Sequence, residues 1–331
     1  MDVVLRRRDF YHQMYNCSFY SVDSIPIERR KHVAYGCFLI ALFIIFELLY
    51  APCLFAMVQK KLRQYFCYKL MIIMTVFDML LMPMNVLFPA YANLKGLAYC
   101  SFPLLSCFNG ITLVAFWIGY ATAAMVLALN RCLSYSKYIW IFKGRYELFW
   151  LALPFLTTSY VLLFGRFCVY SVISGAWFFN PHVDYYPDPT NKYHPFFHLF
   201  ANVSFTVFVP AVYFIFFLSN YKLASNREHG MNKSEYSLFF QLLGINITIA
   251  SAAFSTVVIQ YIQLPQFLTT YTHLSWVFVS GTPPFVYLAS VLWIYNKSIQ
   301  RILMGKLGLK RVSPSHAYQQ DTQNGTSEER F

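Results

Sequence analysis

Hydrophobic positions dominate the chain in seven long runs, which shorter polar segments separate. Each run has about 20 or more mostly apolar residues, the length that an α-helix needs to cross roughly 30 Å of hydrocarbon. The pattern therefore predicts an all-α membrane protein built as a seven-transmembrane helix bundle. The runs cover residues 33–58, 66–91, 104–129, 148–173, 196–219, 238–262 and 267–295.

The third and sixth runs are less uniformly apolar than the others. The third contains Gly110, Thr112, Gly119 and Thr122, and the sixth carries several amide and hydroxyl side chains. Small and polar residues are tolerated in a membrane span where they face neighbouring helices instead of lipid. We see no internal repeat between the halves of the chain, which argues against the repeats of transporters.

Composition and charge exclude a soluble protein and a nucleic-acid-binding one. Of the 331 residues, 58% are hydrophobic and only 12% are charged, against about 25% charged in a typical soluble domain. The net charge of +12 comes from basic residues in short loops, without the stripe of a nucleic-acid site. Basic loops beside apolar spans are typical of the positive-inside rule.

Loop charge also predicts the orientation of the chain. The loops after the first, third and fifth runs, together with the tail, carry sixteen Lys and Arg residues, and the other three loops carry two. This asymmetry predicts a cytoplasmic tail and an external N-terminus. Arg29, Arg30 and Lys31 are an exception, because they lie against the predicted outer end of the first span.

Four segments follow from these patterns. Residues 1–32 form an extracellular N-terminal segment, and residues 33–295 form the transmembrane domain. Apolar residues at helical spacing, with basic residues on the other side, predict that 296–312 is an amphipathic helix on the inner leaflet. Residues 313–331 are polar and predicted to be a disordered cytoplasmic tail.

Asp78 stands near the middle of the second span. A carboxylate there costs about 2.5–3.5 kcal/mol on insertion scales, so we expect it to face the bundle or a wet cavity. One interpretation is a polar hub that binds a cation or a proton and changes partners between states. The alternative is an interior acid that only stabilises the fold.

Asn130 and Arg131 end the third span on its predicted inner side. One hypothesis is a switch in which Arg131 pairs with Glu235, at the start of the sixth span, and releases it on activation. The alternative is that Arg131 only interacts with the helix dipole and with lipid phosphates. Pro284 and Tyr287 belong to a Thr-Pro-Pro-Phe-Val-Tyr sequence that predicts a kink in the seventh span.

The predicted outer side carries a glycosylation sequon at Asn16 and the cysteines Cys17, Cys100 and Cys168. The loop at 174–195 is rich in aromatic residues and proline. It could form a lid over an external pocket, or it could be an interfacial aromatic belt.

Several short sequences stand in a characteristic order along the spans. They are Leu-Tyr-Ala-Pro at 49–52, Cys-Tyr-Lys-Leu-Met at 67–71, Phe-Asp-Met at 77–79, Leu-Ala-Leu-Asn-Arg at 127–131, Trp-Phe-Phe-Asn-Pro at 177–181 and Asn-Lys-Ser-Ile-Gln-Arg at 296–301. In this order they resemble the nematode serpentine chemoreceptors of class T, and the resemblance covers roughly residues 30 to 310. It implies a seven-helix receptor in the plasma membrane of a sensory-neuron cilium, which binds external chemicals and signals through a heterotrimeric G protein.

The chain departs from the broader rhodopsin-like pattern in three places, and one of them is Thr282, because an asparagine usually precedes the proline of the span-seven motif. Asn130 replaces the acidic residue that usually precedes the arginine at the end of the third span. The usual disulfide joins the top of the third span to the fourth loop, and Cys100 fits its first half, but residues 174–195 contain no cysteine. Cys100 therefore pairs with Cys17 or Cys168, or the bond is absent.

We predict a chemosensory receptor, with a transporter or a ligand-gated channel of seven spans as the alternative. Its partners would be a small-molecule ligand, a G protein and membrane lipid. The pocket is expected between the outer halves of the third, fifth, sixth and seventh spans, with Phe108, Asn109, Phe205 and Trp276 as candidates. The sequence has no catalytic motif and no metal-binding motif, and the seventh span has no lysine that could bind retinal. No cofactor is therefore predicted.

Overall fold

The structure is a computed structural model. It describes residues 14–133, 137–186, 188, 192–193, 196–225 and 233–286. At residues 19, 61, 137, 219–225 and 233–246 it describes the backbone but not the side chains. The long helical segments are α4 (Val33–Met57), α6 (Phe66–Met82), α7 (Phe88–Lys95), α8 (Pro103–Leu133), α9 (Arg145–Phe164), α10 (Phe196–Ser225), α11 (Lys233–Tyr261) and α12 (Gln266–Gly281). The shorter elements are η1 (Cys17–Phe19), η2 (Val22–Ser24), α3 (Ile27–Arg30), α5 (Lys60–Arg63), η3 (Pro83–Leu87), η4 (Tyr99–Ser101), η5 (Lys137–Phe142), β1 (Val169–Ser171) and β2 (Ala176–Phe178).

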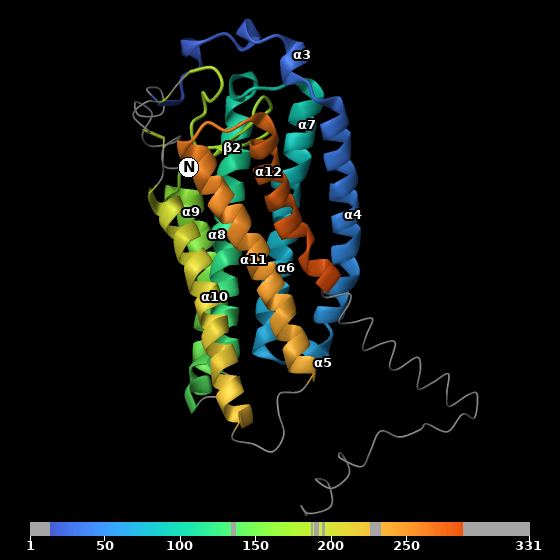
Figure 1. Cartoon of the computed structure of the whole chain (residues 1–331), viewed down its shortest axis with the longest axis vertical. Helices are drawn as coiled ribbons and strands as arrows, with labels where there is room; N and C mark the ends of the chain where they lie inside the picture. Colours follow the sequence, from blue (N-terminus) through green and yellow to red (C-terminus); the bar gives the residue numbers. More distant parts are fainter. Residues whose placement is uncertain are drawn as a thin grey trace, which may run out of the picture. The chain divides into compact units, whose positions relative to one another are not determined.

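The long helices form the all-α bundle of seven spans that the hydrophobic pattern predicts (Figure 1). α6, η3 and α7 together make the second span. By length and composition, five helical segments of the described chain qualify as membrane spans, and α11 and α12 follow as the sixth and seventh. α8 is the central helix, because it packs against α6, α9 and α10 and most of its side chains are buried.

The second span contains a wide turn at Pro83. Proline has no N–H group, so the regular i→i−4 hydrogen bond cannot form at this position. The chain continues as the π-helical turn η3 before α7 begins. A turn of this kind changes the direction of the side chains that follow it, and it is often found at functional sites. Asn85 lies in η3 and is almost fully buried.

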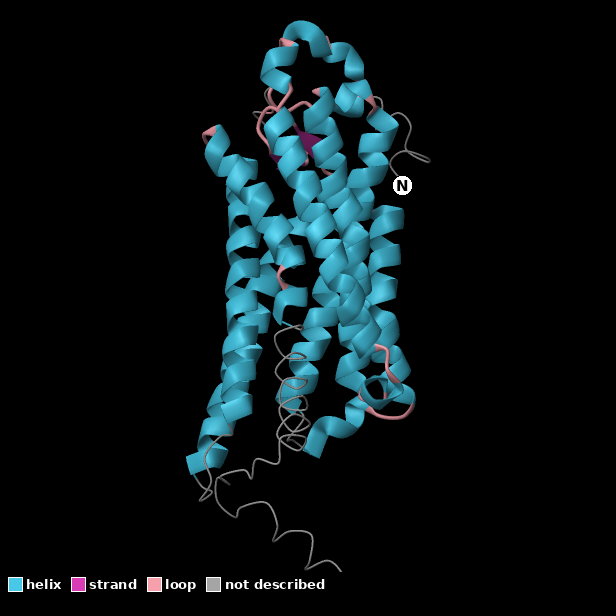
Figure 2. Cartoon of the chain, turned by 90° about the vertical axis from the view of Figure 1, so that its right-hand side faces the viewer, coloured by secondary structure: helices cyan, strands magenta, loops and turns pink. Residues whose placement is uncertain are grey.

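The fourth span is shorter than predicted. The sequence predicts a helix over 148–173, but α9 ends at Phe164, and Val169–Ser171 form the strand β1 instead. β1 pairs antiparallel with β2, so that Tyr170 lies opposite Trp177. Figure 2 shows this hairpin in magenta near one end of the bundle. The run of apolar residues continues past the helix because the hairpin is itself buried, and hydropathy alone does not distinguish the two environments.

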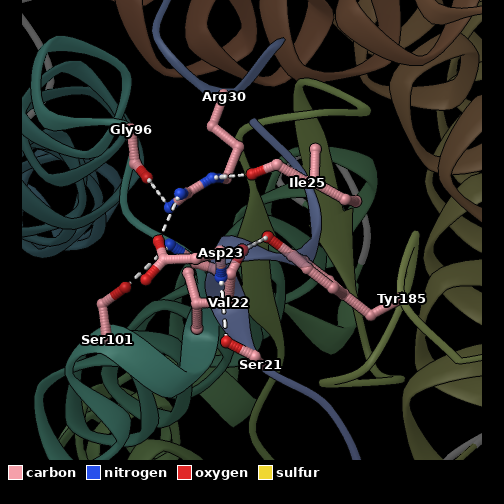
Figure 3. Close-up of polar contacts among 9 residues, drawn as sticks. Ser21, Val22, Asp23, Ile25, Arg30, Gly96, Ser101 and Tyr185 are labelled. Carbon is pink, nitrogen blue, oxygen red and sulfur yellow. Dashed lines mark hydrogen bonds and ion pairs between the residues drawn. The ribbon is translucent and has the colours of Figure 1, made fainter. Parts of the chain in front are cut away.

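Arg30 is one of the three basic residues just before the first span, and it is the one that the structure buries. Its side chain is only 5% exposed and donates hydrogen bonds from Nε to the Ile25 carbonyl oxygen (2.8 Å) and from Nη1 to the Gly96 carbonyl oxygen (3.1 Å). Its Nη2 pairs with Asp23 at 2.8 Å (Figure 3). The guanidinium therefore fastens the N-terminal segment to the end of α7 and is not a charge that faces lipid headgroups.

A disulfide between Cys17 and Cys100 makes a second link between the N-terminal segment and the bundle. Among the alternatives that the sequence leaves open for Cys100, the structure has the pairing with Cys17. Cys168 is instead a buried free thiol. Asn16, the residue of the sequon, is exposed beside this bond, and its side chain accepts a hydrogen bond from the Ser18 backbone N–H.

Candidate functional site

A cavity lies among the spans, and residues in and beside the β1–β2 hairpin form part of its wall. The atom-free space among its side chains, including its opening, is about 630 Å³. The wall is made mostly of apolar and aromatic side chains. It consists of Leu81, Asn85, Leu113, Val114, Trp117, Cys168, Trp177, Phe179, His198, Thr256, Ile259, Thr272, His273, Trp276 and Ser280.

Two tryptophans from facing helices meet edge to face in this wall. The ring centroids of Trp117 and Trp276 are 4.3 Å apart, with an interplanar angle of 77°. The Trp117 indole N–H donates to Asn202 Oδ1 at 2.9 Å, and the Trp276 indole N–H donates to Thr256 Oγ1 at 2.5 Å. Because both indole groups are satisfied within the protein, the rings present their apolar faces and edges to the cavity.

A chain of hydrogen bonds through His273 connects four elements at the cavity. His273 Nε2 lies 2.8 Å from the backbone carbonyl oxygen of Asn85, which can only accept, so Nε2 carries the proton. Its Nδ1 then accepts from the Tyr35 hydroxyl at 2.8 Å. The Trp177 indole N–H donates to Asn85 Oδ1 at 3.1 Å. These bonds hold α4, η3, α12 and the hairpin in one arrangement around the cavity.

Among the described residues, no Asp, Glu, Lys or Arg side chain contributes to the cavity wall. Within the described part of the chain, no group of three His, Cys, Asp or Glu side chains is close enough to hold a metal ion. The site therefore offers shape, aromatic surface and a few neutral polar groups, which suit the binding of a small organic molecule.

Asp78 lies behind the cavity, one helical turn before Leu81 in α6. It is 2% exposed, and the Tyr50 hydroxyl of α4 forms a side-chain hydrogen bond with it. The same hydroxyl donates to the backbone carbonyl oxygen of Ser280 in α12. Asp78 is therefore part of a polar contact between the first, second and seventh spans, next to a residue of the cavity wall. This geometry is compatible with both interpretations of Asp78, the hub and the structural acid.

The four pocket candidates from the sequence have different places. Trp276 lines the cavity, and Phe205 lies behind the wall, with its ring 5.6 Å from that of Trp117. Asn109 is buried and donates to the Met84 carbonyl oxygen at 3.1 Å, so it supports the wide turn η3. Phe108 is 53% exposed and lies outside the cavity wall, because its position in α8 points away from the other spans. We therefore remove Phe108 from the pocket.

The predicted switch residues of the third span lie at the end of α8. Asn130 is buried, and Arg131 is half-buried and close enough to Tyr213 of α10 for its positive charge to act on the Tyr213 hydroxyl. The side chain of Glu235 lies outside the described residues, so the pairing of Arg131 with Glu235 stays a prediction.

The predicted kink of the seventh span lies just after α12. The Pro284 carbonyl oxygen accepts a hydrogen bond from the Cys53 thiol of α4 at 3.5 Å. The proline pair has its effect one turn earlier: Pro284 has no N–H group, so the Ser280 carbonyl oxygen lacks its i+4 donor and instead accepts from the Tyr50 hydroxyl of α4. Tyr287 lies outside the described residues, as do the predicted amphipathic helix at 296–312 and the tail.

Sequence reasoning did not select the neutral polar residues of the site. Asn85, His198 and His273 all stand within predicted spans, and intramembrane polar residues are candidates for function by default. Their polarity within a span could therefore have identified these three residues as candidates, although it could not have shown that they line one cavity. The aromatic loop was noted, and its Trp177 and Phe179 now form part of the cavity wall.

Comparison with known protein families gives one match. Residues 4–316 match the model of the family described as serpentine type 7TM GPCR chemoreceptor Srt. A search of the curated proteins finds no match.

Proposed function

Because the chain belongs to the family of serpentine seven-transmembrane chemoreceptors, we propose that it binds an external small molecule in the cavity described above and signals through a heterotrimeric G protein. It is a multi-pass membrane receptor. We also propose that it is located in the plasma membrane of sensory cilia. A neutral organic ligand would rest against Trp117, Trp177 and Trp276.

The main support for this proposal is that side chains from several spans and a loop together form the cavity. Side chains from α6, α8, α10, α11, α12 and β2 contribute to one wall. A ligand in contact with so many elements has different contacts in different arrangements of the bundle. It therefore shifts the population toward the arrangement that it binds more tightly.

Three features support an external N-terminus. Disulfides persist in oxidising compartments, and the Cys17–Cys100 bond lies in the N-terminal segment and the loop before α8. Arg30 is occupied by protein contacts, so it no longer counts as a free charge at the outer end of the first span. The asymmetry of loop charge also persists: the end of α9 at Phe164 adds Arg166 to the outer loops, but sixteen inner basic residues still stand against three.

The inner end of α8 is the proposed contact with the G protein. Arg131 is half-buried there and follows the buried Asn130. A cationic side chain at a helix C-terminus can interact with the carbonyl groups of its own helix in one state and with a partner protein in another. The polar contact of Asp78, Tyr50 and Ser280 adjoins the cavity, because Ser280 is part of its wall, and we propose that rearrangement of this contact transmits binding.

The test begins with the position of the N-terminus in intact cells. An N-terminal epitope tag should be stained without permeabilisation, and a C-terminal tag only after it. The reverse pattern would contradict the receptor orientation and favour a channel of inverted topology.

The second step measures G-protein activation in cells that express the receptor. The variant Arg131→Ala should reduce the stimulated signal about tenfold or more at equal surface expression, because it removes the proposed contact group. The matched control is Lys143→Ala, an exposed basic residue after α8, which should keep the signal. Equal signals in Arg131→Ala and the wild type would reject this role of Arg131.

A further inference from the structure

Asn85 presents a hydrogen-bond donor to the cavity. Its Oδ1 accepts from the Trp177 indole N–H at 3.1 Å, which fixes the orientation of the carboxamide. Its Nδ2 group has no hydrogen-bond partner among the described residues. Because Asn85 lines the cavity, this Nδ2 group is available to a molecule inside it.

His198 presents a second donor, and the protein fixes its tautomer. Asn202 Oδ1 accepts from the Trp117 indole N–H at 2.9 Å, so its Nδ2 group is directed to His198 Nδ1 at 3.3 Å. An amide nitrogen can only donate, so Nδ1 accepts and the proton of the neutral imidazole is on Nε2. This Nε2–H group has no partner among the described residues, and His198 lines the cavity.

The cavity is therefore unfavourable for a charged ligand. With no ionised side chain in the wall, a charged molecule would lose its hydration without a counter-charge. A hydrocarbon would fit the aromatic surface but would leave both donors without an acceptor. Unsatisfied buried donors reduce affinity by the cost of their desolvation.

We propose that the ligand is a neutral, mainly apolar molecule with a hydrogen-bond acceptor, such as a ketone or an ester. This inference rests on the proposed function, because it names the ligand class of the same site. The acceptor oxygen lies between Asn85 Nδ2 and His198 Nε2, and the apolar part packs against Trp117 and Trp276.

The test compares pairs of compounds that differ in the acceptor. Cyclohexanone and methylenecyclohexane have nearly the same shape, as do acetophenone and α-methylstyrene, and cyclohexylammonium and cyclohexanecarboxylate add charge. Binding is measured as the shift in melting temperature of purified receptor in nanodiscs, with concentrations corrected for partition into lipid. At least one ketone should bind about five- to tenfold more tightly than its hydrocarbon partner, and the ions should not bind.

Two variants assign this preference to the two donors. Asn85→Leu removes the amide donor and keeps a side chain of similar size, and His198→Phe keeps a ring and removes Nε2. In each variant the ketone preference should fall to about twofold or less, while the affinity for the hydrocarbon is unchanged, which shows that the site is folded. The matched control is Phe200→Leu, an outward residue of α10 that is 60% exposed, which should keep the preference.

The outcomes separate the two proposals. Equal binding of ketone and hydrocarbon by the wild type, tighter binding of an ion, or binding of none of the compounds by folded receptor would overturn the ligand class. If ketones bind as expected but never change G-protein activation, the ligand class holds and the signalling role is rejected.

Discussion

α8 and α9 are neighbours in the sequence and pack against each other, yet their surroundings are opposite. In the most apolar part of α8, 83% of the residues are buried inside the protein, and in α9 the corresponding share is 17%. α8 contains Gly110 and Gly119, whereas α9 has no glycine and exposes large residues such as Leu148 and Leu156. Lipid is as apolar as leucine, so close packing and small side chains decide which helix is central.

Two glycines allow other parts of the protein to pack closely against α8. A Cβ atom at Gly110 would lie 1.7 Å from the Cys168 carbonyl oxygen, so the hairpin can approach α8 only at a residue without a side chain. A Cβ atom at Gly119 would lie 2.1 Å from Thr158 Oγ1 of α9. The comparison can be tested by substitutions in both helices, and the expected effects decrease in the following order.

The largest effect is expected for Gly110→Ala. The new methyl group overlaps with backbone atoms of the loop, which cannot rotate away as a side chain can. We expect the free energy of unfolding to fall by more than about 3 kcal/mol, with loss of surface expression. Surface staining measures the expression, and the melting temperature in detergent measures the stability. Wild-type values for both would show that the hairpin does not pack on α8 as described.

Gly119→Ala should be less harmful, because its methyl group meets side chains. We expect a loss of about 1–3 kcal/mol, measured by the melting temperature of the purified receptor. The second substitution Thr158→Ala removes the atom that lies closest and should restore part of the stability. No restoration in the double variant would mean that another contact limits the space, such as the Phe77 ring at 2.9 Å.

The pH dependence of the outer loop should be smaller still. Burial lowers the pKa of His182, and its hydrogen bond to the Met14 carbonyl oxygen opposes this only in part. The unfolded chain therefore takes up the proton more readily, so this contribution to stability is complete above about pH 6.5 and decreases as the pH falls below it.

We expect the melting temperature to drop by a few degrees from about pH 7.5 to about pH 5.5. Most of this drop should disappear in His182→Gln, which does not titrate. A drop of the same size in that variant would assign the pH dependence to other groups.

The smallest effect is expected for Leu156→Ala in α9. The side chain is 59% exposed on the face of the helix that lipid would cover, so little protein packing is lost. We expect the free energy of unfolding to change by less than about 0.5 kcal/mol, in the same melting experiment as Gly119→Ala. A loss as large as that of Gly119→Ala would mean that α9 has a packed partner on this face.

The candidate site could be predicted only in part. Trp276 was selected from the sequence and lines the cavity, whereas Phe108 was selected for the same reason and points outward. An aromatic side chain in a span can face either lipid or a pocket. Which of the two it faces depends on the rotation of its helix, and the neighbouring helices determine that rotation. His198 and Asn85 carried a signal as intramembrane polar residues, but their meeting depends on the turn at Pro83 and on the packing of α10.

The sequence by itself determined the seven spans, the all-α class and the membership in a chemoreceptor family, because long apolar runs have one stable solution in lipid. Only the tertiary structure decided that 169–171 is a strand, that Cys100 pairs with Cys17, and that Arg30 binds the end of α7. These features join residues that are far apart along the chain. Hydropathy is a local property of the chain, whereas such contacts depend on how the helices pack.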